Sequence, residues 1–414
     1  MTQDLNWIEA AVAVARPRVV AALLRRFGSV ELAEEAFQDA CLKALARWPE
    51  QGPPRDPTAW LLAVGRNACI DGVRRAARET SLPEEIAPTE EDEEQARVDA
   101  MDDAVYGDDI LRLLFICCHR DLPRTQQVAL ALRVVSGLTV NEIARAFLVS
   151  ESAMEQRITR AKRTIGQADV RFETPSPLVR TERLTAVSAM IYLIFNEGYA
   201  ASAREAKRKH CLCAEAIRLG RLLLALFPDE AEVTGLVALM LLQHSRTAAR
   251  FDGTGGVVLL EDQDRRLWDA AAIAEGTALT DRAFRMRRPG PYQLQAAIAA
   301  LHGRATTFAQ TDWGQIEQLY AVLAEMQPTP VVALNHAVAV SRVRGPQEAL
   351  ARIEPLAEAL ANYFYYHAVR GHLLERLGRD ADARDAYRRS LGLATSAAEA
   401  TQIRTYIDRL DIKP

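Results

Sequence analysis

A group of polar and basic side chains between residues 151 and 165 has the chemistry needed to read DNA. Arg and Gln side chains can hydrogen-bond to base edges in a major groove, and further cations can neutralise phosphates. On a helix, these side chains would share the solvent side. The pattern predicts a helix that lies in a major groove. The predicted contact residues are Ser152, Gln156, Arg157, Arg160, Lys162 and Arg163.

Two helix starts, thirteen residues apart, would position these side chains. Thr139 lies three residues before Glu142, and Ser152 lies three before Glu155, so each pair can form a capping box. Both helices carry an apolar stripe that can pack inward. The segment therefore predicts a helix-turn-helix; an ordinary helical hairpin with a solvated basic face stays open as the alternative. The apolar positions are Ile143, Ala144 and Phe147 in the first helix and Ile158, Ala161 and Ile165 in the second.

An acidic helix is predicted near the N-terminus, over residues 32–45. Its apolar side chains Leu32, Ala36, Ala40 and Leu45 recur at helical spacing and are expected to face inward. Its acidic side is expected to face solvent, where it could meet a basic protein surface or simply remain solvated. The outward residues are Glu31, Glu34, Glu35, Gln38 and Asp39.

A basic helix is predicted over residues 58–78, after a loop at 48–58 that contains Pro53 and Pro54. Thr58 is expected to cap this helix. Trp60 is interpreted as a core residue in preference to a wedge that stacks on a DNA base. Leu61, Val64 and Ile70 should pack with it. The polar residues that could contact DNA are Arg55, Arg66, Asn67, Arg74 and Arg75, with Arg78 also basic.

An acidic segment separates these two patterns. Residues 79–103 hold eleven carboxylates against a single basic residue, Arg97, together with Pro83 and Pro88. Such a run cannot bury enough apolar surface to fold alone. It is therefore interpreted as a linker between domains at 1–80 and 106–170, with the linker itself at 81–105.

The order of acidic helix, basic helix with the run GRNACIDGVRR, acidic linker and helix-turn-helix closely resembles the extracytoplasmic-function (ECF) sigma factors of bacterial RNA polymerase. The resemblance covers about the first 170 residues, as sigma region 2 followed by region 4. It implies binding to core RNA polymerase at the coiled coil of the largest subunit and at the flap, and binding to promoter DNA. Three sets of residues carry the implied roles: Glu34, Glu35, Gln38 and Asp39 for polymerase; Arg55, Trp60, Arg66, Asn67, Arg74 and Arg75 for the −10 element; and the 152–163 set for the −35 element.

The resemblance also gives the linker and the loop at 48–58 specific roles. In the family, the linker threads through polymerase, where an acidic strand could mimic nucleic acid; a plain solvated tether is an equal alternative. The loop lies where relatives hold a flipped −10 base, which requires only local unstacking.

Length and composition fit an all-α protein of several domains. The chain has 414 residues, is 49% apolar and contains few alternating β-branched runs. No stretch of about 18 uncharged apolar residues exists, so no membrane span is expected. The N-terminus lacks a signal-peptide pattern, which makes the cytoplasm the expected compartment. A net charge of −4 argues against a chain that coats DNA alone, but not against one with two local basic patches and a larger partner.

The cysteines give little support to a metal site. Cys117, Cys118 and His119, and His210, Cys211 and Cys213, lack the CxxC spacing that chelates zinc easily. They are interpreted as small buried apolar thiols. No cofactor and no metal are expected.

Residues beyond 170 form an extension that a minimal sigma factor lacks. Residues 180–290 are predicted to be helical, with Val257–Leu260 as either a short strand or a buried extended loop. Residues 291–414 carry a tetratricopeptide-like (TPR-like) pattern, in which Ala349 lies thirty-four residues before Ala383. Gly345, Gly371, Leu374, Gly378 and Tyr387 fit the same pattern.

A further hairpin is expected at 292–326 and a capping helix at 397–410. Stacked hairpins present a concave face for a protein or peptide, here expected to carry Tyr292, His302, Trp313, Asn335 and His336.

The runs YLIFNEGYAAS and LLEDQDRRLWD resemble the subgroup of these sigma factors that has a C-terminal TPR-like extension. The resemblance implies that the extension is a built-in regulator of sigma activity. It also makes a small DGPF/YCII-like protein, often encoded beside relatives, a candidate partner. Charged side chains in the extension are interpreted as an ion-pair network in preference to a ligand pocket, because buried charges are usually paired. They are Glu197, Arg246, Arg250, Asp262, Asp264 and Arg265.

Two other classes of function were weighed. A stand-alone helix-turn-helix regulator with a ligand- or protein-sensing helical domain would bind a duplex operator without polymerase, usually as a dimer. An enzyme would need a catalytic frame, and the chain shows no phosphate-binding glycine loop, HExxH or GxSxG; Asp312 and His302 are lone residues. The sequence therefore predicts a sigma factor that is not an enzyme.

Overall fold

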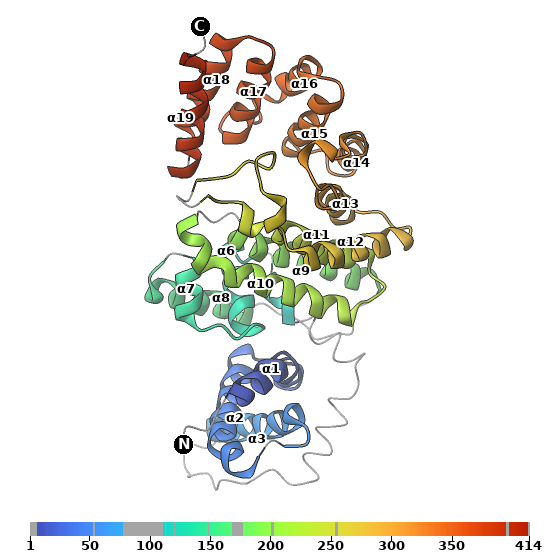
Figure 1. The fold of residues 1–414 in the computed structure, drawn as a ribbon. Coiled ribbons are helices and arrows are strands. Elements are labelled where there is room, and N and C mark those ends of the chain that lie inside the picture. The colour runs from blue at the N-terminus through green and yellow to red at the C-terminus, as the bar shows by residue number, and fades with distance from the viewer. Residues whose placement is uncertain are drawn as a thin grey trace. The chain divides into compact units, whose positions relative to one another are not determined.

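The described chain is helical and divides into two compact units (Figure 1). The computed structural model describes residues 6–52, 54–77, 111, 113–119, 121–147, 149–167, 177–199, 203–252, 256–394 and 397–412. The first unit comprises residues 1–194 and 225–227, and the second comprises 195–224 and 228–414. The predicted all-α class is confirmed: within the described ranges, the one β interaction is a bridge between Phe251 and Val257. Of the described helices, none has a stretch apolar and long enough to cross a bilayer.

Three helices open the first unit: α1 (Asn6–Phe27), α2 (Val30–Gln51) and α3 (Pro57–Ala77). They pack on one another through fully buried side chains such as Leu23, Phe37 and Leu61. Trp48 lies between two other indoles, with ring centroids 5.8 Å from Trp7 and 5.3 Å from Trp60. The indoles of Trp48 and Trp60 are buried and contribute apolar surface to the core of this small bundle.

The ends of the predicted helices need correction here. Helix α2 continues to Gln51, so the predicted loop at 48–58 is confined to residues 52–56, and Trp48 is helical and buried. Asp56, not Thr58, caps α3, because its carboxylate accepts from the amides of Thr58 (2.9 Å) and Ala59 (3.1 Å). Leu45, expected inside, is 46% exposed.

The helix-turn-helix is formed by α7 (Val140–Ala146) and α8 (Glu151–Gln167), supported by α6 (Arg124–Val134). The predicted capping box of Thr139 and Glu142 is confirmed, with both reciprocal hydrogen bonds present. The second predicted cap is wrong: Ser150 accepts from the amide of Ala153, and Ser152 already lies inside α8. The apolar stripe of α8 is buried as predicted, at Ile158, Ala161 and Ile165.

Helix α9 (Pro177–Tyr199) begins in the first unit and ends in the second. Arg183 stacks on the ring of Phe115, 5.0 Å from its centroid, and Met190 Sδ lies 3.4 Å from Cys118 Sγ. The N-terminal half of α9 therefore packs against the segment 113–118, which precedes α6. The predicted linker at 81–105 and the turn at 172–176 lie outside the described residues, so the domain boundaries stay predictions.

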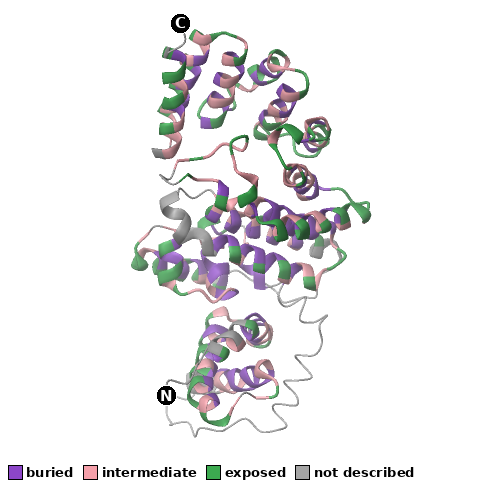
Figure 2. Ribbon diagram, viewed as in Figure 1, coloured by how far each residue is buried: buried purple, intermediate pink, exposed green. Residues whose placement is uncertain are grey.

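The second unit begins with a layer of helices around α11 (Ala231–His244), an almost wholly buried helix (Figure 2). Helices α12 (Ala270–Arg285) and α13 (Pro291–Arg304) pack directly on it. A helix that is apolar on every side is stable only when neighbours cover it completely. The remaining elements of this part are α10 (Ala203–Leu226) and the short 3₁₀ helices η1 (Thr247–Ala249) and η2 (Arg265–Leu267).

Helical hairpins follow in succession, as the repeat pattern predicts. Gly371 permits the closest approach in the array, because a Cβ there would lie 2.6 Å from the ring of Tyr387 on the next helix. Gly345 and Gly378 occupy left-handed turns with φ of 93° and 72°, a region that glycine adopts without strain. The TPR character of the array stays a prediction. Its elements are η3 (Phe308–Gln310), α14 (Trp313–Met326), α15 (Pro330–Val343), α16 (Pro346–Ile353), η4 (Glu354–Leu356), α17 (Phe364–Arg376), α18 (Asp380–Gly392) and α19 (Ala397–Ile412).

Candidate nucleic-acid interface

Helix α8 presents one polar face to solvent, opposite its buried stripe. Ser152, Gln156, Arg160 and Arg163 are exposed, and Arg157 is half-buried. Asn141 on α7 donates to Glu151 at the start of α8 (2.9 Å), which holds the angle between the two helices. A polar face with two or three arginines on a rigid helix pair can reach both base edges and phosphates.

Lys162 differs from the rest of the predicted −35 set, because its ammonium group does not face solvent. Its side chain is 20% exposed, and its Nζ forms an ion pair with Glu34 of α2. The predicted exposure of Lys162 on the solvent side of α8 is therefore wrong in this conformation. A buried ammonium group needs such a counter-charge, since dehydration of an unpaired charge is costly.

Glu34 is the centre of a buried cluster of charges. It was predicted to face outward, and that prediction is wrong: its side chain is only 2% exposed. Arg16 Nη2 lies 3.1 Å and Arg133 Nε 3.8 Å from Glu34 Oε1, while Lys162 binds the other oxygen. One carboxylate thus faces three cations from α1, α6 and α8. The other acidic-face residues, Glu35, Gln38 and Asp39, are exposed as expected.

Arg16 joins this cluster to the C-terminal end of α6. It donates to the carbonyl oxygens of Val134 (3.1 Å) and Arg133 (3.0 Å) and stacks on the ring of Phe37 (5.1 Å). Burial lowers the pKa of Arg16, and the neighbouring Glu34 opposes that shift. Sequence reasoning missed Arg16, although it lies within the apolar stripe of α1, between Val12 and Val19 at helical spacing.

The predicted −10 residues of α3 are only partly placed by the structure. Trp60 is 8% exposed and packs edge-on against Trp48, so its interpretation as a core residue is confirmed. Arg66 and Asn67 are half-buried side by side on α3, and Arg55 is exposed in the loop before it. Arg74 and Arg75 belong to α3, but their side chains lie outside the described residues.

In the extension, the predicted charged set forms contacts that differ from an ion-pair network. Arg246 donates to the hydroxyl of Tyr199 (2.9 Å), and the guanidinium of Arg250 stacks 3.8 Å from the Tyr199 ring centroid. Arg265 donates to the carbonyl oxygens of Ala305 (2.6 Å) and His302, and stacks on Trp268. These arginines connect loops to helices through hydrogen bonds to oxygen atoms and through stacking on aromatic rings.

The acidic members of that set are at the surface. Asp264 pairs with Arg266 (2.7 Å), a residue outside the predicted set, while Glu197 and Asp262 are exposed. The hydrogen bonds from Arg266 hold the pKa of Asp264 at about 2.

Residues of the hairpins and of the preceding loop line an open apolar pocket of about 280 Å³. Trp313, Tyr365 and Tyr406 line it, and Leu259–Glu261 close it from the preceding loop, which is irregular and not a strand. Arg342 pairs with Glu261 (2.8 Å) and thereby holds the loop in place. Of the predicted concave-face residues, Trp313 lines this cavity and contacts His302, and His336 stacks on Tyr320.

Within the described ranges, no three His, Cys, Asp or Glu side chains lie together as they would to hold a metal ion. Cys117 and Cys213 are buried as predicted, whereas Cys118 is half-buried and not fully buried as expected; Cys69 is also buried and Cys41 is half-buried. Burial raises the pKa of Cys41 to about 11 and that of Cys118 to about 12, so these thiols are protonated at neutral pH.

Comparison with known proteins agrees with this arrangement. The family models for Sigma-70 region 2 and Sigma-70 region 4 match residues 12–79 and 112–165, and a family of unknown function (DUF6596) matches residues 183–284. The uncharacterized protein R00370 of Rhizobium meliloti (strain 1021) is 59% identical over 412 residues, which cover 99% of this chain and 97% of that protein. The ECF RNA polymerase sigma factor SigD of Mycobacterium tuberculosis (strain ATCC 25618 / H37Rv) is 31% identical over 152 residues, 34% of this chain and 68% of SigD. SigD of Mycobacterium bovis (strain ATCC BAA-935 / AF2122/97) matches to the same extent.

Proposed function

The chain belongs to the ECF RNA polymerase sigma factors, and from that premise we propose that it binds core RNA polymerase and directs initiation at its own promoters. The observation that supports this best is the polar face of α8, which stays exposed while its apolar stripe is buried. In this proposal, Gln156, Arg157 and Arg160 read the −35 element, and Ser152 and Arg163 contact it beside them. Base contacts of this kind specify sequence, whereas phosphate contacts set position.

The proposed polymerase contact uses the exposed acidic side chains of α2. Glu35, Gln38 and Asp39 remain available for the coiled coil of the largest subunit, and region 4 is proposed to meet the flap. Glu34 is removed from this set, because its carboxylate is already bound by three cations. For the −10 element, the proposed residues are Arg55, Arg66, Asn67, Arg74 and Arg75.

Lys162 gives the proposal a conformational step. It cannot contact a DNA phosphate while its ammonium group is bound to Glu34. We therefore propose that this ion-paired arrangement of α2 and α8 is a resting state and that promoter binding replaces Glu34 with a phosphate. The exchange is electrostatically feasible, because a phosphate can replace a carboxylate as the partner of a cation.

The extension is proposed to regulate this activity in the same chain. Its support is the resemblance of the extension to those of related sigma factors, together with the apolar pocket that the hairpins and the preceding loop line. A small DGPF/YCII-like protein is a proposed partner. A stand-alone operator-binding regulator is less well supported, because region 2 has no use in such a protein.

Reconstituted transcription tests the proposed function. The purified chain, mixed with core polymerase, should yield run-off transcripts from a subset of genomic promoters and should bind those promoters weakly when alone. A chain ending at residue 175 should still direct initiation, with altered yield if the extension regulates it. Tight binding to a duplex site without polymerase, and no transcripts with it, would overturn the proposal.

A further inference from the structure

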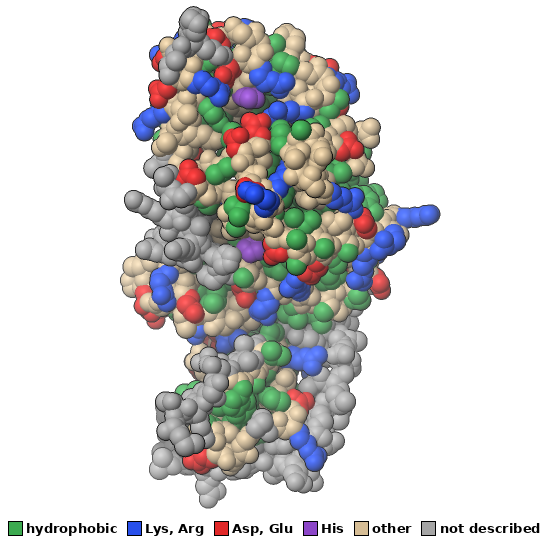
Figure 3. All heavy atoms as spheres, in the orientation of Figure 1, with side chains coloured by type: hydrophobic (Ala, Val, Ile, Leu, Met, Phe, Trp, Pro, Cys, Tyr) green, Lys and Arg blue, Asp and Glu red, His purple; other side chains and the backbone are tan. Residues whose placement is uncertain are grey.

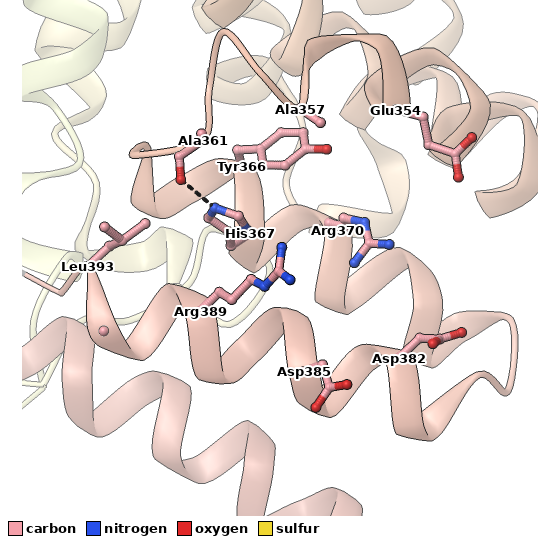
Figure 4. A pocket seen from close by; sticks show the side chains of 11 residues that line it. Glu354, Ala357, Ala361, Tyr366, His367, Arg370, Asp382, Asp385, Arg389 and Leu393 are labelled. Atoms are coloured by element: carbon pink, nitrogen blue, oxygen red, sulfur yellow. Dashed lines mark hydrogen bonds between the residues drawn. The ribbon is translucent and has the colours of Figure 1, made fainter.

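A cleft of about 690 Å³ lies beside the last helical hairpin and is used by none of the functions above (Figure 4). Helix α17 contributes Tyr366, His367 and Arg370, and α18 contributes Arg389 from the facing side. His367 is held by a hydrogen bond between its Nε2 and the carbonyl oxygen of Ala361 (2.8 Å), which fixes one wall. The size is within the range of about 300–1,000 Å³ that small-molecule sites occupy.

The two arginines of this cleft are free to bind an anion. In Figure 4 the guanidinium groups of Arg370 and Arg389 reach from different helices into the same space beside Tyr366. Among the described residues, neither forms an ion pair or hydrogen bond. The nearby aspartates are already engaged: Asp382 pairs with Arg379 (2.7 Å) and Asp385 with Arg388 (3.6 Å).

Tyr366 places a hydroxyl group at the wall of this cleft, between the two arginines and the protein core. The residue is only 3% exposed, yet no described residue hydrogen-bonds its hydroxyl, which points into the cleft. The hydroxyl itself is reached by water at the surface of the cleft, so a bound ligand can take the place of that water. Burial raises the pKa of Tyr366, which keeps the hydroxyl protonated and able to donate.

We propose that this cleft binds a small molecule through a phosphoryl group, held by the guanidinium groups of Arg370 and Arg389 and by the hydroxyl of Tyr366. The planar fork of a guanidinium matches the spacing of phosphate oxygens and donates two parallel hydrogen bonds. Two such forks and one hydroxyl supply donors from three directions, which suits a tetrahedral dianion with three terminal oxygens.

Carboxylates at one end of the cleft limit what else the ligand can be. Glu354 and Asp382 lie at that end in Figure 4, away from Leu393 at the other. Glu354 would repel a second anionic group, so a nucleic acid or other polyanion is disfavoured, and its carboxylate can accept hydrogen bonds from hydroxyl or amino groups. Figure 3 shows acidic and basic side chains interspersed over the C-terminal helices on the face in view, without the continuous basic surface that a polyanion needs. A phosphomonoester with hydroxyl groups fits both ends.

Titration calorimetry on the full chain tests the proposal, with ribose 5-phosphate, inorganic phosphate and ribose as probes. Ribose 5-phosphate should bind, inorganic phosphate should compete with it, and ribose should not bind. Arg370→Met and Arg389→Met should each weaken ribose 5-phosphate binding by about tenfold to a hundredfold, as expected for loss of a charged hydrogen bond. Arg404→Met is the matched control, because Arg404 is exposed on α19 and is no part of the cleft wall.

Tyr366→Phe separates a binding role from a structural one. It should weaken ribose 5-phosphate binding by about threefold to tenfold while leaving the melting temperature of the free chain unchanged, because no described residue bonds to this hydroxyl. Absence of binding by both phosphate probes at about 10 mM, or equal affinity in wild type and in the well-folded Arg389→Met variant, would overturn the proposal. The outcome does not depend on promoter recognition, since no DNA or polymerase takes part.

Discussion

Replacing Glu34 with glutamine should loosen the first unit strongly, because the change removes the only carboxylate among three described cations of this cluster. At the 3.1 Å between Arg16 Nη2 and Glu34 Oε1, an effective dielectric constant of about 20 gives an attraction of about 5 kcal/mol. Most of that attraction offsets lost hydration. Removing one partner is still costly, since the other charges stay buried and unpaired, and the expected loss is about 3–5 kcal/mol.

A matched variant on the same helix isolates the effect of burial. Glu35→Gln removes the neighbouring charge, which is exposed, and should change stability by no more than about 0.5 kcal/mol. Native-state hydrogen exchange of the α2 amides in the full chain measures the local free energy of opening for both variants. Similar protection in Glu34→Gln and Glu35→Gln would refute the burial of Glu34.

A double-mutant cycle tests the contact between α2 and α8 itself. Lys162→Met alone leaves Glu34 with Arg16 and Arg133 and should cost less than Glu34→Gln. The double variant should cost less than the sum of the two, with a coupling of about 1–3 kcal/mol typical of residues in one ion-pair network. Additive effects would show that Lys162 and Glu34 do not interact in solution. That result would also contradict the proposed resting state.

Three further outcomes are expected. Arg157→Ala should relax discrimination at one −35 base pair by about 1–3 kcal/mol, measured by run-off transcription on promoter variants; a uniform loss across all variants would reject base reading. Burial, reinforced by two nearby arginines, lowers the pKa of His302 to about 3. The unfolded chain therefore takes up a proton below pH 6.5 that the folded chain does not. Stability should fall as the pH drops through that window, by about 2 kcal/mol at pH 5. Thermal melts of wild type and His302→Gln check this, since the variant should lose that share of the pH dependence; identical pH profiles would contradict it. Gly371→Ala should destabilise the hairpin array by about 1–3 kcal/mol, because the new methyl meets the ring of Tyr387. Gly392→Ala, which has open space, should be neutral or stabilising in the same calorimetric scan, and equal losses in both would show that the α17–α18 approach is looser than described.

Local signals in the sequence were sufficient for the helices that carry the proposed DNA-binding surface. The periodicity of α8 and the capping box of Thr139 depend on residues three and four positions apart, and such spacings are visible without a fold. The same reasoning found the hairpins and the close-approach position of Gly371. It failed at the start of α8, where Ser150 and Ser152 are both capable caps and only the backbone selects Ser150.

Tertiary structure alone decided which charges are buried and which side chains meet. The sequence places Glu34 on a polar face with four other acidic-face residues, and nothing within a few positions distinguishes it from Glu35. Its burial results from Arg133 and Lys162, which come from helices far along the chain. The same holds for Arg370 and Arg389, which share a cleft only because α17 and α18 pack against each other. Helix formation depends on neighbours in sequence, whereas the cost of dehydrating a charge depends on neighbours in space, and only the folded chain brings those together.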